Sequence, residues 1–305
     1  MFRMNRFYLY RIGMGTRKKS RIGLKNITQG DVLGVGGFAT VYRAIYKDKS
    51  YAMKVEPIYE KDTEESLAIP QWREIEFAKT MHRLYPDHFM QLYDVRIVHP
   101  CDHKQTYKPG HFKDVSKSSY CMQTLWSIVT PGLPVAPYYD LVIQIVYIIY
   151  LMQKEGYYHN DLTMQNIGYV TTTKKSLTIL GHVIPTHGFL LQAIDYGKAL
   201  HAKYELTAKE RHNLATKNDL FWFLSYKENV FTTSLRPYVK KQIETYLPKE
   251  PVGPTYKTYF AEILSICLFG DQSKITYLIP RATILYMIKH VHHPRDVLEY
   301  LLKHR

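Results

Sequence analysis

A long apolar segment in the middle of the chain is the feature that most limits how this sequence can fold. Residues Leu141–Met152 are all apolar or aromatic except Gln144. A helix needs about 20 apolar residues to cross a bilayer, so this run is too short to span a membrane. It predicts instead a buried helix over Tyr138–Gly156, around which the second half of the chain must pack.

The predicted helix leads into a polar loop with the sequence His159-Asn160-Asp161-Leu162-Thr163-Met164-Gln165-Asn166, and a short strand, Ile167–Val170, follows it. Asp161 can accept a hydrogen bond from an attacking hydroxyl group. Asn166 offers an uncharged oxygen of the kind that suits Mg²⁺ beside a phosphate. Such a string can also occur in an ordinary polar loop, so its meaning depends on the features around it.

A glycine-rich turn lies near the start of the predicted folded part, in the sequence Leu33-Gly34-Val35-Gly36-Gly37-Phe38-Ala39-Thr40-Val41. Glycines let the backbone approach phosphates closely and leave N–H groups free to bind them. The flanking β-formers Val32-Leu33 and Val41-Tyr42 predict one strand before the turn and a second strand after it. Taken alone, the turn is better explained by an ordinary hairpin. A dinucleotide-binding turn would lead directly into a helix, whereas here two strands follow, Val41–Ile45 and Tyr51–Val55. This order favours a loop that covers the phosphates of a mononucleotide.

Lys54 alternates with apolar residues on the third predicted strand, where a lysine can hold the α and β phosphates of a nucleotide. The helix predicted over Gln71–Leu84 offers two acidic partners, Glu74 and Glu76. Positions three, four and seven residues later are apolar after Glu74 and polar after Glu76: Phe77, Ala78 and Met81 against Lys79, Thr80 and Arg83. Glu74 is therefore expected at the edge of the buried face, paired with Lys54.

Further strands are predicted over four segments: Phe89–Val98, Ser119–Val129, Leu177–Ile184 and Phe189–Ile194. The strand predicted over Phe189–Ile194 leads directly into Asp195-Tyr196-Gly197. An aspartate at such a place, shortly before a glycine, can project its carboxylate towards a bound metal. A buried helix is predicted over Phe221–Leu224, with Asp219 as its N-terminal residue, where the helix dipole stabilises its charge. The segment His99–Lys117 is polar and predicts a loop insertion.

In this order, the glycine-rich turn, Lys54, Glu74, the H-N-D-L-T-M-Q-N loop and D-Y-G resemble the eukaryotic-type protein kinase superfamily, from about Gly30 to the C-terminus. The segment V-I-P-T-H-G-F, which runs into I-D-Y-G-K, further resembles serine/threonine kinases of large nucleocytoplasmic DNA viruses. The resemblance implies an α+β, bilobal fold: a basic arm over residues 1–29, a small β-rich N-lobe over 30–129 and a larger, mainly helical C-lobe over 130–305.

The resemblance also implies ATP and Mg²⁺ as cofactors and a protein as substrate. Asp161 would be the catalytic base, Lys54 would bind the α and β phosphates and pair with Glu74, and Asn166 and Asp195 would hold Mg²⁺. Asp219 would brace the catalytic loop. The implied nucleotide-binding residues are Gly34, Gly36, Gly37, Phe38, Val41, Ala52 and Lys54.

Several residues depart from the family pattern. Asn160 replaces the arginine that commonly receives an activating phosphate, Thr163 replaces the usual lysine two residues after the base, and Ala39 replaces the third loop glycine. No A-P-E motif follows D-Y-G. Two alternatives therefore stay open beside a protein kinase: a small-molecule kinase of the same fold and a catalytically silent scaffold. The scaffold is disfavoured because no required lysine or carboxylate is missing.

The chain carries a formal net charge of +14, which predicts acidic partners. Much of this charge lies before Ile27 without any acidic residue, at Arg3, Arg6, Arg11, Arg17, Lys18, Lys19, Arg21 and Lys25. This arm is either a solvated tail or a tether to an acidic partner or nucleic acid. The three cysteines form neither a C-x-x-C pair nor a plausible disulfide framework, which favours a reducing, intracellular location. The resemblance to viral kinases implies a host cytoplasm or a virion as that location. No secretory signal or membrane span is predicted.

Overall fold

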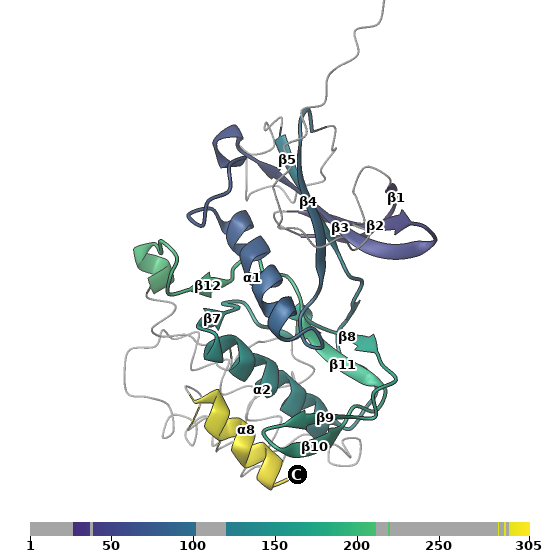
Figure 1. Cartoon of the computed structure of the whole chain (residues 1–305), viewed down its shortest axis with the longest axis vertical. Helices are drawn as coiled ribbons and strands as arrows, with labels where there is room; N and C mark the ends of the chain where they lie inside the picture. The colour runs from purple at the N-terminus through teal and green to yellow at the C-terminus, as the bar shows by residue number, and fades with distance from the viewer. Residues whose placement is uncertain are drawn as a thin grey trace, which may run out of the picture. The chain divides into compact units, whose positions relative to one another are not determined.

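The computed structural model describes residues 27–36, 39–101, 120–211, 219, 286, 290 and 293–305 (Figure 1). The described part is mixed α+β, as expected. The chain divides into two compact units: unit 1 comprises residues up to Pro86 together with Met90–Ile128, and unit 2 comprises Asp87–Phe89 together with Val129–Arg305. The basic arm, the segment 102–119 and most of residues 212–292 lie outside the described residues. The expectation of a mainly helical second lobe falls largely on that last segment.

Unit 1 contains a five-stranded antiparallel sheet in the order β1-β2-β3-β5-β4. Each strand of the sheet was expected from the sequence. Their bounds are β1 Thr28–Val35, β2 Thr40–Tyr46, β3 Lys49–Ile58, β4 Leu92–Val98 and β5 Tyr120–Trp126. β4 begins later than predicted, because Phe89 makes an isolated bridge with Ala193 of unit 2 instead.

Helix α1, Pro70–Leu84, packs on one face of this sheet. Proline at its first turn has no N–H that the helix would leave unpaired, so it suits this start. The helix and the sheet share an apolar cluster that includes Trp72, Ile75 and Ile58. A second apolar cluster, with Met53, Val55 and Leu125 among its members, buries the opposite face of the sheet. Both faces of β3 are therefore covered, which explains why its residues from Tyr51 to Ile58 are buried except for Lys54, which is partly exposed.

Unit 2 is built on helix α2, Tyr138–Lys154, as the apolar segment predicted. Gln144, the polar residue within that segment, is fully buried, and its Oε1 accepts a hydrogen bond of 2.9 Å from the N–H of Leu191. Helix α8, Pro294–Lys303, lies alongside α2 (Figure 1) and buries Val297, Leu298 and Leu301. Within the described residues, no helix is long and apolar enough to cross a membrane.

Three small sheets complete the described part of unit 2. They pair β11 with β8 and β8 with β6, β10 with β9, and β12 with β7. Their bounds are β6 Thr130–Pro131, β7 Tyr157–Tyr158, β8 Ile167–Thr171, β9 Ser176–Ile179, β10 His182–Pro185, β11 Phe189–Ala193 and β12 Leu200–His201. The prediction of one strand over Leu177–Ile184 was wrong. Leu180 and Gly181 have φ of 48° and 84°, which makes a two-residue turn that folds the segment into the β9–β10 hairpin.

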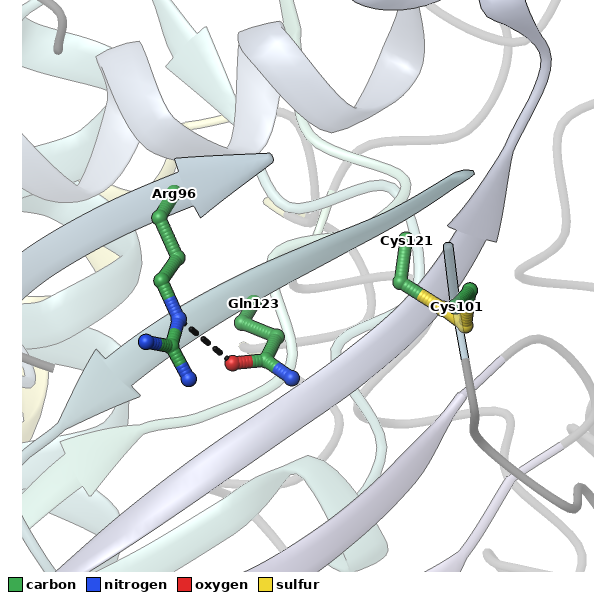
Figure 2. The surroundings of a disulfide bond; sticks show 4 residues. All are labelled: Arg96, Cys101, Cys121 and Gln123. Atoms are coloured by element: carbon green, nitrogen blue, oxygen red, sulfur yellow. Dashed lines mark hydrogen bonds between the residues drawn. A yellow bond between two sulfur atoms is a disulfide. The ribbon is translucent and has the colours of Figure 1, made fainter. Parts of the chain in front are cut away.

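Cys101 and Cys121 form a disulfide, so the expectation that the cysteines do not pair was wrong (Figure 2). β4 and β5 are neighbours, and Val98 pairs directly with Cys121. The chain that leaves β4 therefore brings Cys101 back to the start of β5, with a Cα–Cα distance of 5.4 Å. Disulfides are uncommon in the cytosol, so the cysteines give no argument for a reducing compartment.

Candidate functional site

Gly34, Val41 and Lys54 lie in one row across the sheet of unit 1. Gly34 of β1 pairs with Val41 of β2, and Val41 pairs with Lys54 of β3. Directly paired residues point to the same face of a sheet, and so do residues two apart on one strand. Ala52, two residues before Lys54, therefore joins the same face. Four of the residues predicted to bind a nucleotide are thus brought together by the strand register.

Lys54 forms an ion pair with Glu74, with Nζ 2.7 Å from Oε2. Glu74 lies on α1, and both side chains are largely buried, at 15% and 7% exposure. Glu76, the alternative partner, accepts a hydrogen bond from Thr80 of its own helix. Helical spacing therefore predicted correctly which acidic residue pairs with Lys54. The apolar face of the helix on which that prediction rested is also confirmed, since Phe77, Ala78 and Met81 are fully buried.

A second carboxylate near Lys54 was not predicted. Oε2 of Glu56 lies 3.6 Å from Nζ of Lys54, and Oε1 of Glu56 accepts a hydrogen bond of 2.6 Å from Nε2 of Gln71. Strand alternation could have identified it, because Glu56 stands two residues after Lys54. The lysine ammonium thus lies between two carboxylates, one from its own strand and one from α1.

The glycine-rich turn connects β1 and β2. The N–H of Gly36 donates to the carbonyl of Ala39 at 2.8 Å and closes the turn, while Gly37 and Phe38 lie outside the described residues. A Cβ added to Gly34 would meet no described atom within 4 Å. Packing within the described residues therefore does not demand glycine at this position.

In unit 2, the loop His159–Asn166, called the acidic loop after Asp161, is held in shape by its last residue, Asn166. Nδ2 of Asn166 donates to the backbone carbonyl of Asp161 at 2.7 Å, and its N–H donates to the carbonyl of Thr163 at 2.9 Å. Because the side-chain nitrogen of Asn166 bonds within the loop, its side-chain oxygen is the atom that can bind a ligand. The carboxylate of Asp161 remains partly exposed, at 29%.

Strands β8 and β11 bring the two predicted metal-binding residues to one end of their antiparallel pair. Asn166 immediately precedes β8, and its carbonyl accepts a hydrogen bond of 2.9 Å from the N–H of Ile194. Asp195 follows Ile194 and is exposed, with a φ of 58°. Few non-glycine residues adopt this left-handed conformation, and aspartate is among those that tolerate it best. The pair Asn166 and Asp195 supplies oxygen donors, which hard divalent cations prefer.

Asp219 holds the backbone of the same loop from a distant part of the sequence. Its two carboxylate oxygens accept hydrogen bonds of 2.8 Å from the N–H groups of His159 and Asn160. Burial raises the pKa of Asp219, and its interactions with His159 and Asn160 oppose that rise. The brace is as expected, whereas the helix predicted over Phe221–Leu224 lies outside the described residues. His159 adds a bond from Nε2 to the carbonyl of Ile194 at 2.9 Å.

Lys198 contacts Asp161 and was not predicted as a site residue. Its Nζ lies 2.8 Å from Oδ2 of Asp161, from a position directly after Asp195-Tyr196-Gly197. One feature of the sequence could have identified it: a lysine directly follows D-Y-G, and no lysine stands at the position of Thr163. The described residues contain no cluster of three or more His, Cys, Asp and Glu side chains suited to a metal.

No model of a known protein family matches this chain, and no curated protein matches its sequence. Unit 1 presents a lysine that is paired with a buried helical glutamate beside an open glycine turn. Unit 2 presents a braced acidic loop with oxygen donors at the end of a strand pair. Such sets suit the binding of phosphate groups and the activation of a hydroxyl.

Proposed function

We propose that this chain is an ATP-dependent protein kinase that transfers the γ-phosphate to serine or threonine hydroxyls. In this proposal unit 1 is the N-lobe and unit 2 the C-lobe of a bilobal kinase fold. The observation that carries the proposal is the Lys54–Glu74 ion pair at 2.7 Å between the third strand and the following helix. Protein kinases require such a pair to hold the α and β phosphates.

The proposed nucleotide site uses the row on the sheet of unit 1. Val41 and Ala52 offer small apolar side chains on the face that carries Lys54, which suits the adenine ring. Gly34 and Gly36 offer a turn in which the backbone can approach phosphates. Gly37 and Phe38 belong to the proposed site by sequence only.

The proposed chemistry uses the acidic loop of unit 2. Asp161 accepts the proton of the substrate hydroxyl and orients it for in-line attack. Asn166 and Asp195 fit Mg²⁺, because the amide nitrogen of Asn166 is already used by Asp161 and both residues offer oxygen. When bound, Mg²⁺ neutralises charge on the phosphates. Asp219 keeps the loop in place throughout.

A small-molecule kinase of the same fold is the second candidate. It is favoured by Thr163, which stands where protein kinases of the serine/threonine type usually carry lysine, and by the lack of an A-P-E motif. Either enzyme needs ATP and would act inside a cell. The basic arm, residues 1–29, would give it a means of attachment to an acidic partner or nucleic acid.

The test is transfer of radiolabelled γ-phosphate from ATP and Mg²⁺ to casein and to a basic protein. Asp161→Ala should abolish transfer, and Lys54→Met and Asp195→Asn should do so with the fold intact. Asp296→Ala, which removes an exposed carboxylate from α8, is the matched control and should stay active. ATP binding without transfer to any protein would contradict a protein kinase and favour the small-molecule enzyme. Equal activity in Asp161→Ala and the wild type would overturn the site.

A further inference from the structure

The carboxylate of Asp161 has a lysine partner, but not at the position where the kinase pattern places one. Thr163, two residues after Asp161, is neutral and buried. Lys198 comes instead from the loop after β11, with Nζ 2.8 Å from Oδ2 of Asp161. The other side-chain bond recorded to this carboxylate, from Nδ2 of Asn166, is long at 3.5 Å. Lys198 is therefore the closest cation contact of Asp161 in the described part of the chain.

The backbone on both sides of Lys198 is firmly held. Tyr196 is buried, and its hydroxyl donates to the carbonyl of Ala193 at 2.6 Å. The N–H of Ala199 donates to the carbonyl of Tyr196 at 2.9 Å, which closes a tight turn around Lys198. Leu200 then begins β12, which pairs with β7 just before the acidic loop. Lys198 thus projects from a short, anchored segment and not from a free loop.

We propose that Lys198 is a positioning residue that supplies, from the segment after D-Y-G, the cation that Thr163 does not provide. Its bond to Oδ2 fixes the orientation of the Asp161 carboxylate and leaves Oδ1 to accept the hydroxyl proton. In this proposal the ammonium of Lys198 also lies near the phosphoryl group during transfer. A fixed cation there stabilises the negative charge that develops on the phosphoryl oxygens. This inference rests on the proposed kinase function.

The alternative is an ordinary surface ion pair, and the chain offers a matched control for it. Lys174 pairs with Asp87 at 2.5 Å, and its side chain is 53% exposed, the same as that of Lys198. Exposed pairs contribute little to stability, so neither pair is expected to matter much for folding. If Lys198 acts only as such a pair, its loss should have the same effect as the loss of Lys174.

The experiment compares the full-length wild type with Lys198→Met, Lys198→Arg and Lys174→Met in the same transfer assay, with melting temperature and ATP binding measured for each. Lys198→Met should lower kcat roughly 10- to 100-fold with the KM for ATP within about 3-fold. Lys198→Arg, which keeps the charge, should recover part of kcat. Lys174→Met should behave as the wild type.

Two results would overturn the inference while leaving the proposed function intact. An active wild type with an unchanged Lys198→Met variant would make the contact a surface ion pair. A faster Lys198→Met variant would mean that the lysine blocks Asp161. A wild type that binds ATP but transfers no phosphate would instead overturn the proposed function and, with it, this inference. If Lys198→Met fails to fold, a kcat for Lys198→Arg below that of Lys174→Met supports the positioning role, and equal kcat values contradict it.

Discussion

The carboxylate of Asp219 accepts a hydrogen bond of 2.8 Å from the backbone N–H of His159, which lies 60 residues earlier in the chain. The same carboxylate takes a second N–H, from Asn160, whose φ of 60° turns the backbone towards it. Asparagine tolerates this left-handed conformation better than most residues. The buried side chain of Asp219 thus holds two successive N–H groups of the acidic loop, which fixes the backbone that carries Asp161.

Replacing Asp219 should loosen the loop. Asp219→Ala leaves both N–H groups without their acceptor, which costs roughly 1–3 kcal/mol of folding free energy for each buried group that stays unpaired. Amide hydrogen exchange at His159 and Asn160 should become faster, and phosphate transfer should fall. Asp219→Asn, which keeps one acceptor oxygen, should lie between the wild type and Asp219→Ala. Unchanged exchange in Asp219→Ala would show that the loop does not depend on this carboxylate.

Glu74 and Glu76 form a natural matched pair for testing the partner of Lys54. Glu74→Gln removes the charge 2.7 Å from Lys54, whereas Glu76→Gln alters a residue that bonds Thr80 of its own helix. We expect kcat to fall about 10- to 100-fold in Glu74→Gln and to stay within about 2-fold in Glu76→Gln. Steady-state kinetics with ATP as the varied substrate measures both. Equal losses in the two variants would contradict the assigned role of Glu74.

The sequence predicted correctly those helices and strands whose pattern lies within a few consecutive residues. The apolar run around Gln144 predicted α2, and strand alternation with the glycine turn predicted β1, β2 and β3. The spacing after Glu74 predicted the right ion pair because a helical period relates residues of known separation. Asp219 was expected as the brace only through the family resemblance.

The errors arose where contacts join distant residues or where a turn is weakly marked. The β9–β10 hairpin was missed because Leu180 takes a positive φ, which a leucine gives no reason to expect. The Cys101–Cys121 pair was missed because it depends on β4 and β5 being neighbours. Lys198 was missed for the same reason, since its contact with Asp161 spans 37 positions.

Gly168 should be intolerant of any side chain. A Cβ at this position of β8 would lie 2.5 Å from Cγ1 of Val129 and 2.7 Å from the carbonyl oxygen of Thr130. The oxygen belongs to the backbone of β6 and cannot move without breaking the pairing with β8. Gly168→Ala should therefore lower the free energy of unfolding by roughly 1–3 kcal/mol.

Gly34→Ala is the control for Gly168→Ala, because a Cβ at Gly34 meets open space. Its melting temperature should match that of the wild type, whereas that of Gly168→Ala should drop by several degrees. Thermal unfolding followed by circular dichroism measures both. An unchanged melting temperature in Gly168→Ala would mean that β6 is free to shift.

The disulfide can be checked by thiol counting. Of the three cysteines, Cys101 and Cys121 are paired. Alkylation of the denatured chain without reductant should therefore modify only Cys267, and prior reduction should add two further modifications, as read by intact mass. Cys101→Ser should lower stability by about 2–4 kcal/mol under oxidising conditions and by much less in reductant. Alkylation of all three thiols without reductant would contradict the pairing.

The buried side chain of His88 should make the stability of the fold depend on pH. Burial lowers its pKa from the ordinary 6.5 to about 4, while Nδ1 hydrogen-bonds the carbonyl of Leu191 at 3.2 Å and the ring packs edge-to-face on Tyr147. Between pH 6.5 and 4 the unfolded chain therefore binds a proton that the folded chain does not. Its contribution to stability is complete above pH 6.5 and is lost as the pH falls towards 4, by roughly 3 kcal/mol.

His88→Gln should reduce this pH dependence, because glutamine keeps an N–H donor for Leu191 but has no group that titrates. His182→Gln replaces an exposed histidine and should leave the dependence as in the wild type. Urea unfolding at several pH values between 7 and 4.5 gives the free energies to compare. Because His88 is less protonated in the folded than in the unfolded chain, its removal should make the free energy of unfolding fall less steeply as the pH is lowered. Parallel curves for the wild type and His88→Gln would mean that other groups cause the acid instability.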